Sequence, residues 1–156
     1  MFSTLPPRLK TANYSPPRGG ADGREGTLNE DTSPDAVRAF FRRDLFAGYV
    51  GIELIEAGAG RATARLELKD HHRNGLGVVH GGAIFTLADL AFAAAVNSRG
   101  RAAVAIHCSI SYLKAAEGPH LIARAEEVSC GPKIAAYTIR ITDASEELIA
   151  RFEGLA

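Results

Sequence analysis

The longest apolar stretch of the chain runs from Ala83 to Val96 and consists almost entirely of Ala, Leu, Phe, Ile and Val. A helix that is apolar on every face must be buried on every side. The stretch from Gly81 to Val96 is 16 residues long, shorter than the roughly 20 of a membrane span, and it has Asp89 near its centre. We therefore expect the central helix of a globular core and no membrane segment.

The residues before this stretch predict a helix and two strands. Ser-Pro-Asp at 33–35 is typical of a helix start, so we expect one amphipathic helix from there to near Gly48. Alternating apolar residues then predict two strands. Val50 belongs to the first strand, and Gly58 and Gly60 mark the turn between the two.

Four more strands are predicted after the long helix. Residues 102–113 alternate regularly between apolar and polar, and weaker alternation follows at 120–129, at 133–142 and from Leu148 to Phe152. Short turns between these four strands indicate an antiparallel meander. A sheet with one apolar face must cover something, and the long helix is the only candidate. The predicted fold class is therefore α+β.

Composition separates the first residues from the rest. Residues 1–32 contain four prolines and four glycines and show no apolar periodicity. Such a segment lacks the apolar content to pack, so we expect 1–32 to be a disordered extension and 33–156 to be one domain. Lys plus Arg and Asp plus Glu both total 18. This balance argues against a nucleic-acid or anionic-membrane partner.

Cysteine and histidine indicate neither a disulfide framework nor a metal site. The two cysteines, Cys108 and Cys130, are too few for either. We expect both to be small buried residues in strands, as in a reducing, cytoplasmic compartment. His71 and His72 lack the regular spacing of metal ligands and are expected to be solvated loop residues.

Candidate chemistry gathers between Asn74 and Asp89. The predicted helix start at Gly81 offers unpaired N–H groups and the positive end of a helix dipole. Gly81 and Gly82 have no side chains, so a ligand oxygen can approach this backbone closely, as an oxyanion requires. Asp89 is costly in an apolar helix and is a candidate base or nucleophile. A tight loop-to-helix entry and a hydrogen-bonded core carboxylate are the alternatives.

Helix geometry separates these two groups. Gly81 and Asp89 are eight residues apart, which is about 12 Å along an α-helix. One small carbonyl group cannot contact both in the same chain. If both act on it, Asp89 must come from a second subunit, and a two-fold dimer with antiparallel helices creates two such sites.

The residues Asn74, His80-Gly81-Gly82 and Leu87-Ala88-Asp89 resemble the signature of hotdog-fold acyl-CoA thioesterases. The chain is most similar to the phenylacetate-pathway thioesterase group, over residues 35–156. The resemblance implies a hotdog fold, in which a curved antiparallel β-sheet wraps a long central helix, in a homodimer that is commonly part of a homotetramer. It also implies hydrolysis of acyl-CoA or aryl-CoA thioesters in phenylacetate degradation, with no metal and no cofactor.

The resemblance also assigns roles by position. Asp89 is the implied general base or nucleophile, and the Gly81 N–H, beside Gly82, is implied to polarise the thioester carbonyl. Asn74 is implied to orient the attacking water, and His80 to hold the loop. The CoA phosphates need cations, and the candidates by loop or strand-end position are Arg73, Lys114 and Lys133.

One position departs from the family pattern. Related enzymes carry a Ser or Thr near the start of the strand after the helix, and Ala105 stands there in this chain. His107 lies two residues further on. In a regular strand it shares a face with Ala105, so it is the residue that we expect to reach the site instead.

Two other functions stay open from the sequence. A hotdog enoyl-CoA hydratase or dehydratase uses a His and an acid for proton transfer, but His80 directly before the glycine pair looks structural. A non-catalytic acyl-CoA-binding module would not need Asp89. Release of free CoA separates hydrolysis from both alternatives.

Overall fold

The computed structural model describes residues 32–156, so the expected extension 1–32 lies outside the described residues except for Thr32. The helices along this part of the chain are α1 (Pro34–Phe41), α2 (Leu45–Val50), the short 3₁₀ turn η1 (Asp70–His72) and α3 (Gly81–Asn97). The strands are β1 (Ile52–Gly58), β2 (Arg61–Glu67), β3 (His107–Tyr112), β4 (His120–Cys130), β5 (Ala135–Asp143) and β6 (Leu148–Leu155). Within residues 32–156, no helix is long and apolar enough to cross a membrane.

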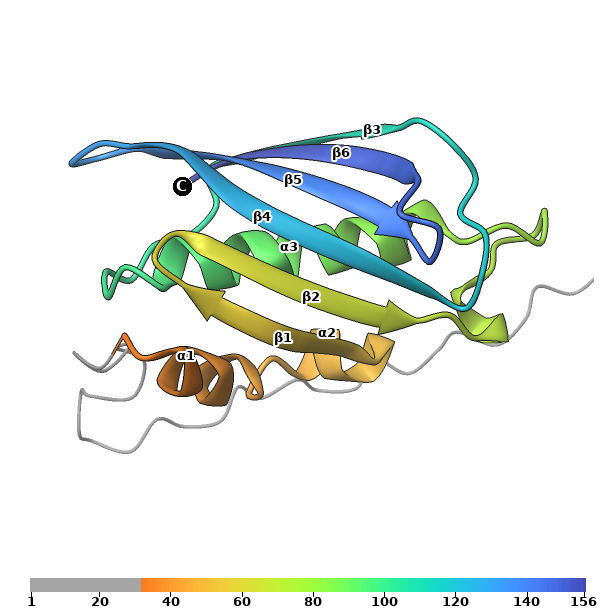
Figure 1. The fold of residues 1–156 in the computed structure, drawn as a ribbon, viewed down its shortest axis with the longest axis horizontal. Coiled ribbons are helices and arrows are strands. Elements are labelled where there is room, and N and C mark those ends of the chain that lie inside the picture. Colours follow the sequence, from red (N-terminus) through yellow and green to blue (C-terminus); the bar gives the residue numbers. More distant parts are fainter. Residues whose placement is uncertain (1–31) are drawn as a thin grey trace, which may run out of the picture.

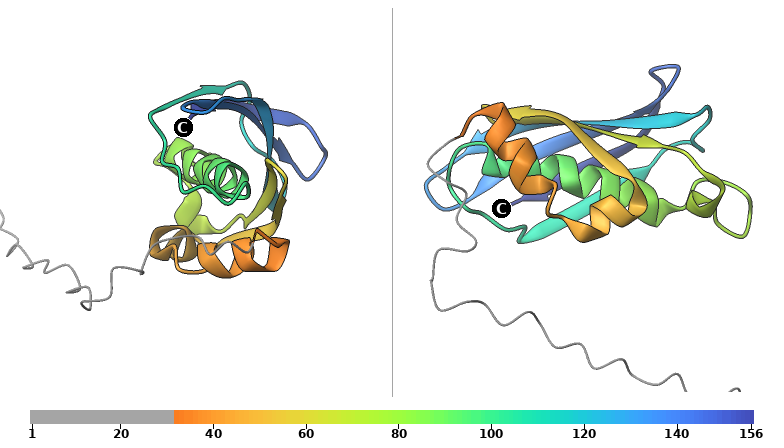
Figure 2. Two further views of the ribbon diagram at one scale, coloured as in Figure 1. Left: turned by 90° about the vertical axis from the view of Figure 1, so that its left-hand side faces the viewer. Right: turned by 90° about the horizontal axis from the view of Figure 1, so that it is seen from below.

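The six strands form one antiparallel sheet in the order β1-β2-β4-β5-β6-β3, and this sheet wraps α3 (Figures 1 and 2). Leu87, Ala91 and Ala95 of α3 are fully buried, and Ala64 and Ile139 face them from the sheet side with no exposure. The predicted alternation in β2 and the predicted central helix are both confirmed. The fold is the expected α+β arrangement of a long central helix inside a curved antiparallel sheet.

The position of β3 differs from the predicted meander. Strands β4, β5 and β6 follow one another, but β3 pairs with β6 at the far edge of the sheet. The connection 113–119 must therefore pass three strand spacings, about 14 Å, to reach β4. Its seven residues can span about 23 Å when extended. Both topologies were therefore compatible with the loop length.

β3 is also shorter than predicted, because residues 102–105 lie outside the ladder. The side chain of Asn97, at the end of α3, donates to the Ala103 carbonyl at 3.1 Å and accepts from the Ala103 N–H at 3.0 Å. These two bonds occupy the backbone groups that a neighbouring strand would use. Val104 next to this contact is 80% exposed.

The single helix predicted before the first strand is two helices. Asp44 Oδ1 accepts the Ala47 N–H at 2.9 Å and so caps a second helix, α2. Leu45 is 85% exposed instead of completing one apolar face. Val50 ends α2 rather than opening a strand, because Gly51 follows in the left-handed region at φ +84°.

Two further sequence expectations were wrong. His72 is buried, because its Nδ1 accepts the Lys69 N–H at 3.0 Å and its Nε2 donates to the Val50 carbonyl at 2.8 Å. The ring therefore ties the loop before α3 to α2. Cys130 is exposed at the end of β4, and Cys108 is half-buried in β3.

Gly154 in β6 allows the sheet to approach α3 closely. A Cβ atom there would lie 2.7 Å from the ring of Phe92, which is itself buried against Tyr137 and Phe152.

We expect Gly154→Ala to lower the free energy of unfolding by about 1–3 kcal/mol, the usual cost of overpacking a core. Urea denaturation measures this. Gly75→Ala, where nothing lies within 4 Å, is the control, and equal stability of the two variants would contradict the packing argument.

Candidate active site

The N-terminus of α3 is held by the histidine before it. His80 Nδ1 accepts the Gly82 N–H at 2.8 Å, and the His80 backbone N–H donates to the His72 carbonyl at 2.7 Å. The Gly81 N–H donates to no acceptor within residues 32–156. It therefore remains available to a ligand oxygen at the positive end of the helix dipole.

Gly81 opens onto a cavity of about 450 Å³ that Tyr112, Leu113 and Lys114 also line. The Tyr112 hydroxyl donates to the Gly81 carbonyl at 2.9 Å, and a Cβ on Gly81 would lie 3.1 Å from that hydroxyl. Glycine is thus the residue that fits beneath the tyrosine ring. Lys114 donates to Glu147 at 2.5 Å, and this hydrogen bond raises the pKa of the ammonium group.

Asn74 closes the loop before the helix. Its side-chain oxygen accepts the Leu76 N–H at 2.9 Å, its backbone N–H donates to the Val78 carbonyl, and its carbonyl accepts from Gly77. The side-chain NH₂ of Asn74 has no partner within residues 32–156. Arg73 beside it donates to the Gly77 carbonyl at 2.9 Å, so its charge is held in the same loop.

Asp89 lies half-buried in a different cavity, of about 460 Å³, which we call the Asp89 cavity. The walls of this cavity are nearly all apolar: Phe40, Phe41, Phe92, Ala93, Val96, Ala102, Ala103, Val104, Ala105 and Ala156. Burial raises the pKa of the Asp89 carboxyl above its ordinary value, and the charge of Asp44 raises it further. A carboxylate with a raised pKa is a stronger base than one in water, which suits proton abstraction near neutral pH.

The structure separates the two halves of the predicted site within one chain. Gly81 and Asp89 lie on the same continuous helix, and their cavities share no lining residue. Lys114 lies near Gly81, next to the start of β6. Lys133 lies in the hairpin between β4 and β5, which is near the other end of β6. The proposed cations are therefore not brought together.

Ala105 precedes β3 and lines the Asp89 cavity, but His107 does not line that cavity. His107 is the first residue of β3 and is exposed, while Cys108 after it points inward and is half-buried. Burial raises the pKa of the Cys108 thiol, and the charge of Asp89 raises it further. Strand alternation therefore brings Cys108, rather than His107, toward Asp89.

Sequence reasoning missed three residues that line these cavities: Phe40 and Phe41 in the Asp89 cavity, and Tyr112 beside Gly81. Each was assigned to an apolar face of a helix or strand, and none carries a motif that marks it as a site residue. Only the packing of α1 and β3 against α3 shows that they border the functional groups. Within residues 32–156, no cluster of His, Cys, Asp or Glu is arranged to hold a metal ion.

Comparison with known proteins places these residues in a family context. A profile described as the thioesterase superfamily matches residues 76–150. A protein of Archaeoglobus fulgidus, described as a candidate esterase, is 42% identical over 73% of this chain and 75% of its own length. The Escherichia coli acyl-coenzyme A thioesterase PaaI is 36% identical over 76% of this chain and 85% of its own.

The fold agrees with the sequence comparison. The solved structure of E. coli PaaI, from the phenylacetic acid degradation operon, superimposes with a TM-score of 0.72 at 35% identity. The match covers 75% of this chain and 86% of that protein. The hotdog fold expected from the resemblance is therefore confirmed.

The environment of Asp89 predicts a pH-dependent cost to stability. Because the folded chain holds the Asp89 proton more tightly than the unfolded chain, wild-type stability falls as pH rises from about 4 through the raised pKa. Asp89→Asn removes this loss, so we expect it to melt at a higher temperature than wild type at pH 7. The difference should disappear below about pH 4.

Thermal melting between pH 3 and pH 8 measures this difference. Asp70→Asn, at an exposed carboxylate of η1, is the control and should follow wild type. A pH-independent difference between Asp89→Asn and wild type would show that the substitution acts through packing instead of charge.

Proposed function

This chain belongs to the thioesterase superfamily and is a thioester hydrolase, and on that basis we propose that it hydrolyses acyl-CoA or aryl-CoA thioesters to a free acid and CoA. The observation that carries the proposal is the pairing of two features of α3. One is the unpartnered Gly81 N–H at its start, and the other is the half-buried Asp89 in an apolar cavity. Such a pair supplies an oxyanion donor and a base.

In the proposed reaction, the Gly81 N–H donates to the thioester carbonyl oxygen and stabilises the negative charge that develops there. Asp89 takes a proton from water as the water oxygen bonds to the acyl carbon, with the Asn74 amide orienting that water. The carbon–sulfur bond then breaks, and the proton passes to the CoA sulfur. Direct attack by the Asp89 carboxylate, followed by hydrolysis of the anhydride, is the alternative course.

We propose that each site is shared between two chains, because about 12 Å of helix separates Gly81 from Asp89. The open edge of β3 supports a homodimer. Val104 and Ile106, which lead into this edge strand, are 80% and 62% exposed, and exposed apolar groups at a strand edge favour pairing with a second chain. We further propose that two such dimers associate into a homotetramer. We also propose that the protein acts in phenylacetate degradation and is located in the cytoplasm.

The geometry favours hydrolysis over the other two functions. His80 uses its Nδ1 to cap α3, so that nitrogen is not available for proton transfer to an acyl chain as a hydratase requires. A binding module has no use for a carboxylate with a raised pKa in its apolar cavity. Lys114, Arg73 and Gly82, near the start of α3, remain the candidates for holding CoA there, and Lys133 and His107 lie further away.

Release of free CoA from a panel of acyl-CoA and aryl-CoA thioesters, followed with a thiol-reactive dye, tests the function. We expect Asp89→Asn to lower kcat by at least about 10²-fold, the scale of a lost general base. Asp70→Asn is the matched carboxylate control and should retain wild-type kcat. A folded Asp89→Asn variant with wild-type turnover would remove Asp89 from the mechanism, and a panel that yields no CoA would refute the function.

A mixed dimer tests the shared site. Gly81→Val fills the oxyanion position and displaces the exposed Tyr112 ring, while Asp89→Asn removes the base. In a heterodimer one site receives both defects and the other neither. Co-refolding the two inactive variants should restore up to about a quarter of wild-type activity, since half of the dimers are mixed and one site in two is intact. Native mass spectrometry counts the heterodimers, and confirmed heterodimers without activity would count against a shared site.

A further inference from the structure

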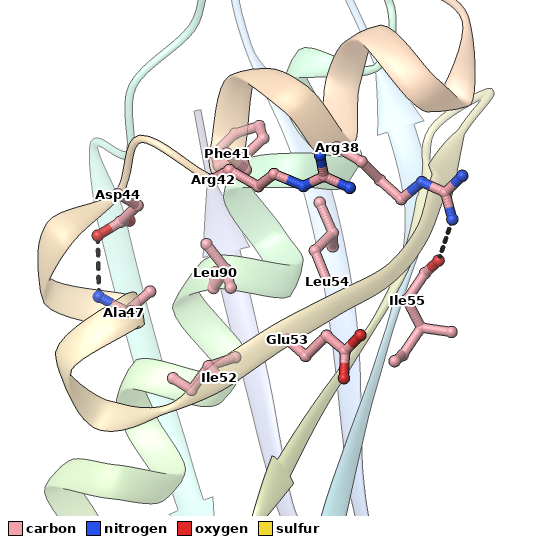
Figure 3. A pocket seen from close by; sticks show the side chains of 11 residues that line it. Arg38, Phe41, Arg42, Asp44, Ala47, Ile52, Glu53, Leu54, Ile55 and Leu90 are labelled. Atoms are coloured by element: carbon pink, nitrogen blue, oxygen red, sulfur yellow. Dashed lines mark hydrogen bonds between the residues drawn. The ribbon is translucent and has the colours of Figure 1, made fainter.

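The cavity beside Asp89 has a neighbour. A second cavity, of about 470 Å³, lies between α1, α2 and β1 (Figure 3). Among residues 32–156, Phe41 is the one residue that lines both cavities. Its ring, at the end of α1, therefore stands between the space next to the candidate base and the space behind it.

The positions on α3 show that the two cavities are adjacent. Asp89 lines the first cavity, and Leu90, the next residue of the helix, lines the second. Successive residues of an α-helix point about 100° apart, so the cavities occupy neighbouring sides of α3. Figure 3 shows Phe41 projecting from α1 on the side of the cavity where Leu90 lies. The Phe41 ring therefore lies between the two cavities.

The second cavity can accept an alkyl group. Its apolar lining is Phe41, Ala47, Ile52, Leu54, Ile55 and Leu90. Its charged residues, Arg38, Arg42, Asp44 and Glu53, have both signs, and Arg42, Asp44 and Glu53 are exposed. An alkyl chain that extended past Phe41 would lie along the apolar lining and remove that surface from water.

We propose that Phe41 sets the length of the acyl group by closing the Asp89 cavity toward this second cavity. The inference rests on the proposed function and deepens it. With the ring in place, an acyl group bound beside Asp89 ends at Phe41, so short acyl and single-ring acyl groups are the preferred substrates. Without the ring the two cavities join, and a long alkyl chain gains contact with the apolar side chains of the second cavity.

Phe40 offers a matched control. It precedes Phe41 on α1, the two rings pack edge to face with centroids 5.3 Å apart, and both are half-buried. Phe40 lines the Asp89 cavity but not the second one. Removing either ring enlarges the first cavity, but only loss of Phe41 connects it to its neighbour.

The experiment compares kcat/KM for butanoyl-, octanoyl-, dodecanoyl-, hexadecanoyl- and phenylacetyl-CoA in wild type, Phe41→Ala, Phe41→Leu and Phe40→Ala. We expect Phe41→Ala to raise the ratio of hexadecanoyl to butanoyl kcat/KM by about tenfold or more, since each added methylene in an apolar pocket is worth about tenfold or more. Phe41→Leu should shift the ratio in the same direction by less. Phe40→Ala should shift the ratio less than Phe41→Ala, because it enlarges the Asp89 cavity without joining it to the second cavity.

Each result is decisive for one of the two claims. Equal ratios in Phe41→Ala and wild type, or equal shifts in Phe41→Ala and Phe40→Ala, would overturn the role of Phe41 while CoA release still supports the proposed function. Wild-type protein that releases no CoA from any substrate would instead refute the function. Thermal melting confirms that each variant folds. If Phe41→Ala does not fold, Phe41→Leu decides the question, and an unchanged ratio there counts against the inference.

Discussion

The burial of α3 inside the sheet is the interaction on which the rest of the structure depends. Five residues of α3 have no exposed surface: Leu87, Ala88, Ala91, Ala94 and Ala95. The curved sheet wraps around this helix (Figure 2). Because the helix is mostly alanine on its inner side, the strands approach it closely, and Gly154 opposite Phe92 is one result. The same rigid helix carries a free N–H at its start and a carboxylate in its middle. Their separation is set by the rise of the helix, and our proposal of a site shared between two chains follows from that distance.

The position of Asp89 lowers the stability of the fold at the pH where the carboxyl group is ionised. Burial raises its pKa, so the ionised form, which we propose as the base, is also the form that the fold accommodates less well. Enzymes commonly accept such a cost at the reacting group because the rest of the core supplies the stability. Here the compensating contacts lie on the other faces of α3, against β2, β4 and β5, away from the cavity.

Local patterns predicted the elements well, and non-local contacts account for the errors. The start of α3 at Gly81 and the place of Asp89 within it follow from a helix that is apolar on all faces and interrupted by one acid. The place of β3 does not follow, because the connection 113–119 is long enough for either topology. The early end of regular structure at 102–105 depends on the Asn97 side chain, and the burial of His72 depends on the Val50 carbonyl. The sequence pattern does not indicate either of these contacts.

Half of the residues that line the Asp89 cavity come from α1 and from the irregular segment 102–105. Neither of these two segments belongs to the strand ladder of the sheet. In our proposals, the reacting groups lie on α3, whereas the residue that limits the acyl group, Phe41, lies on α1. A substitution in α1 can then alter the acyl pocket without changing the spacing of Gly81 and Asp89, which the helix alone fixes.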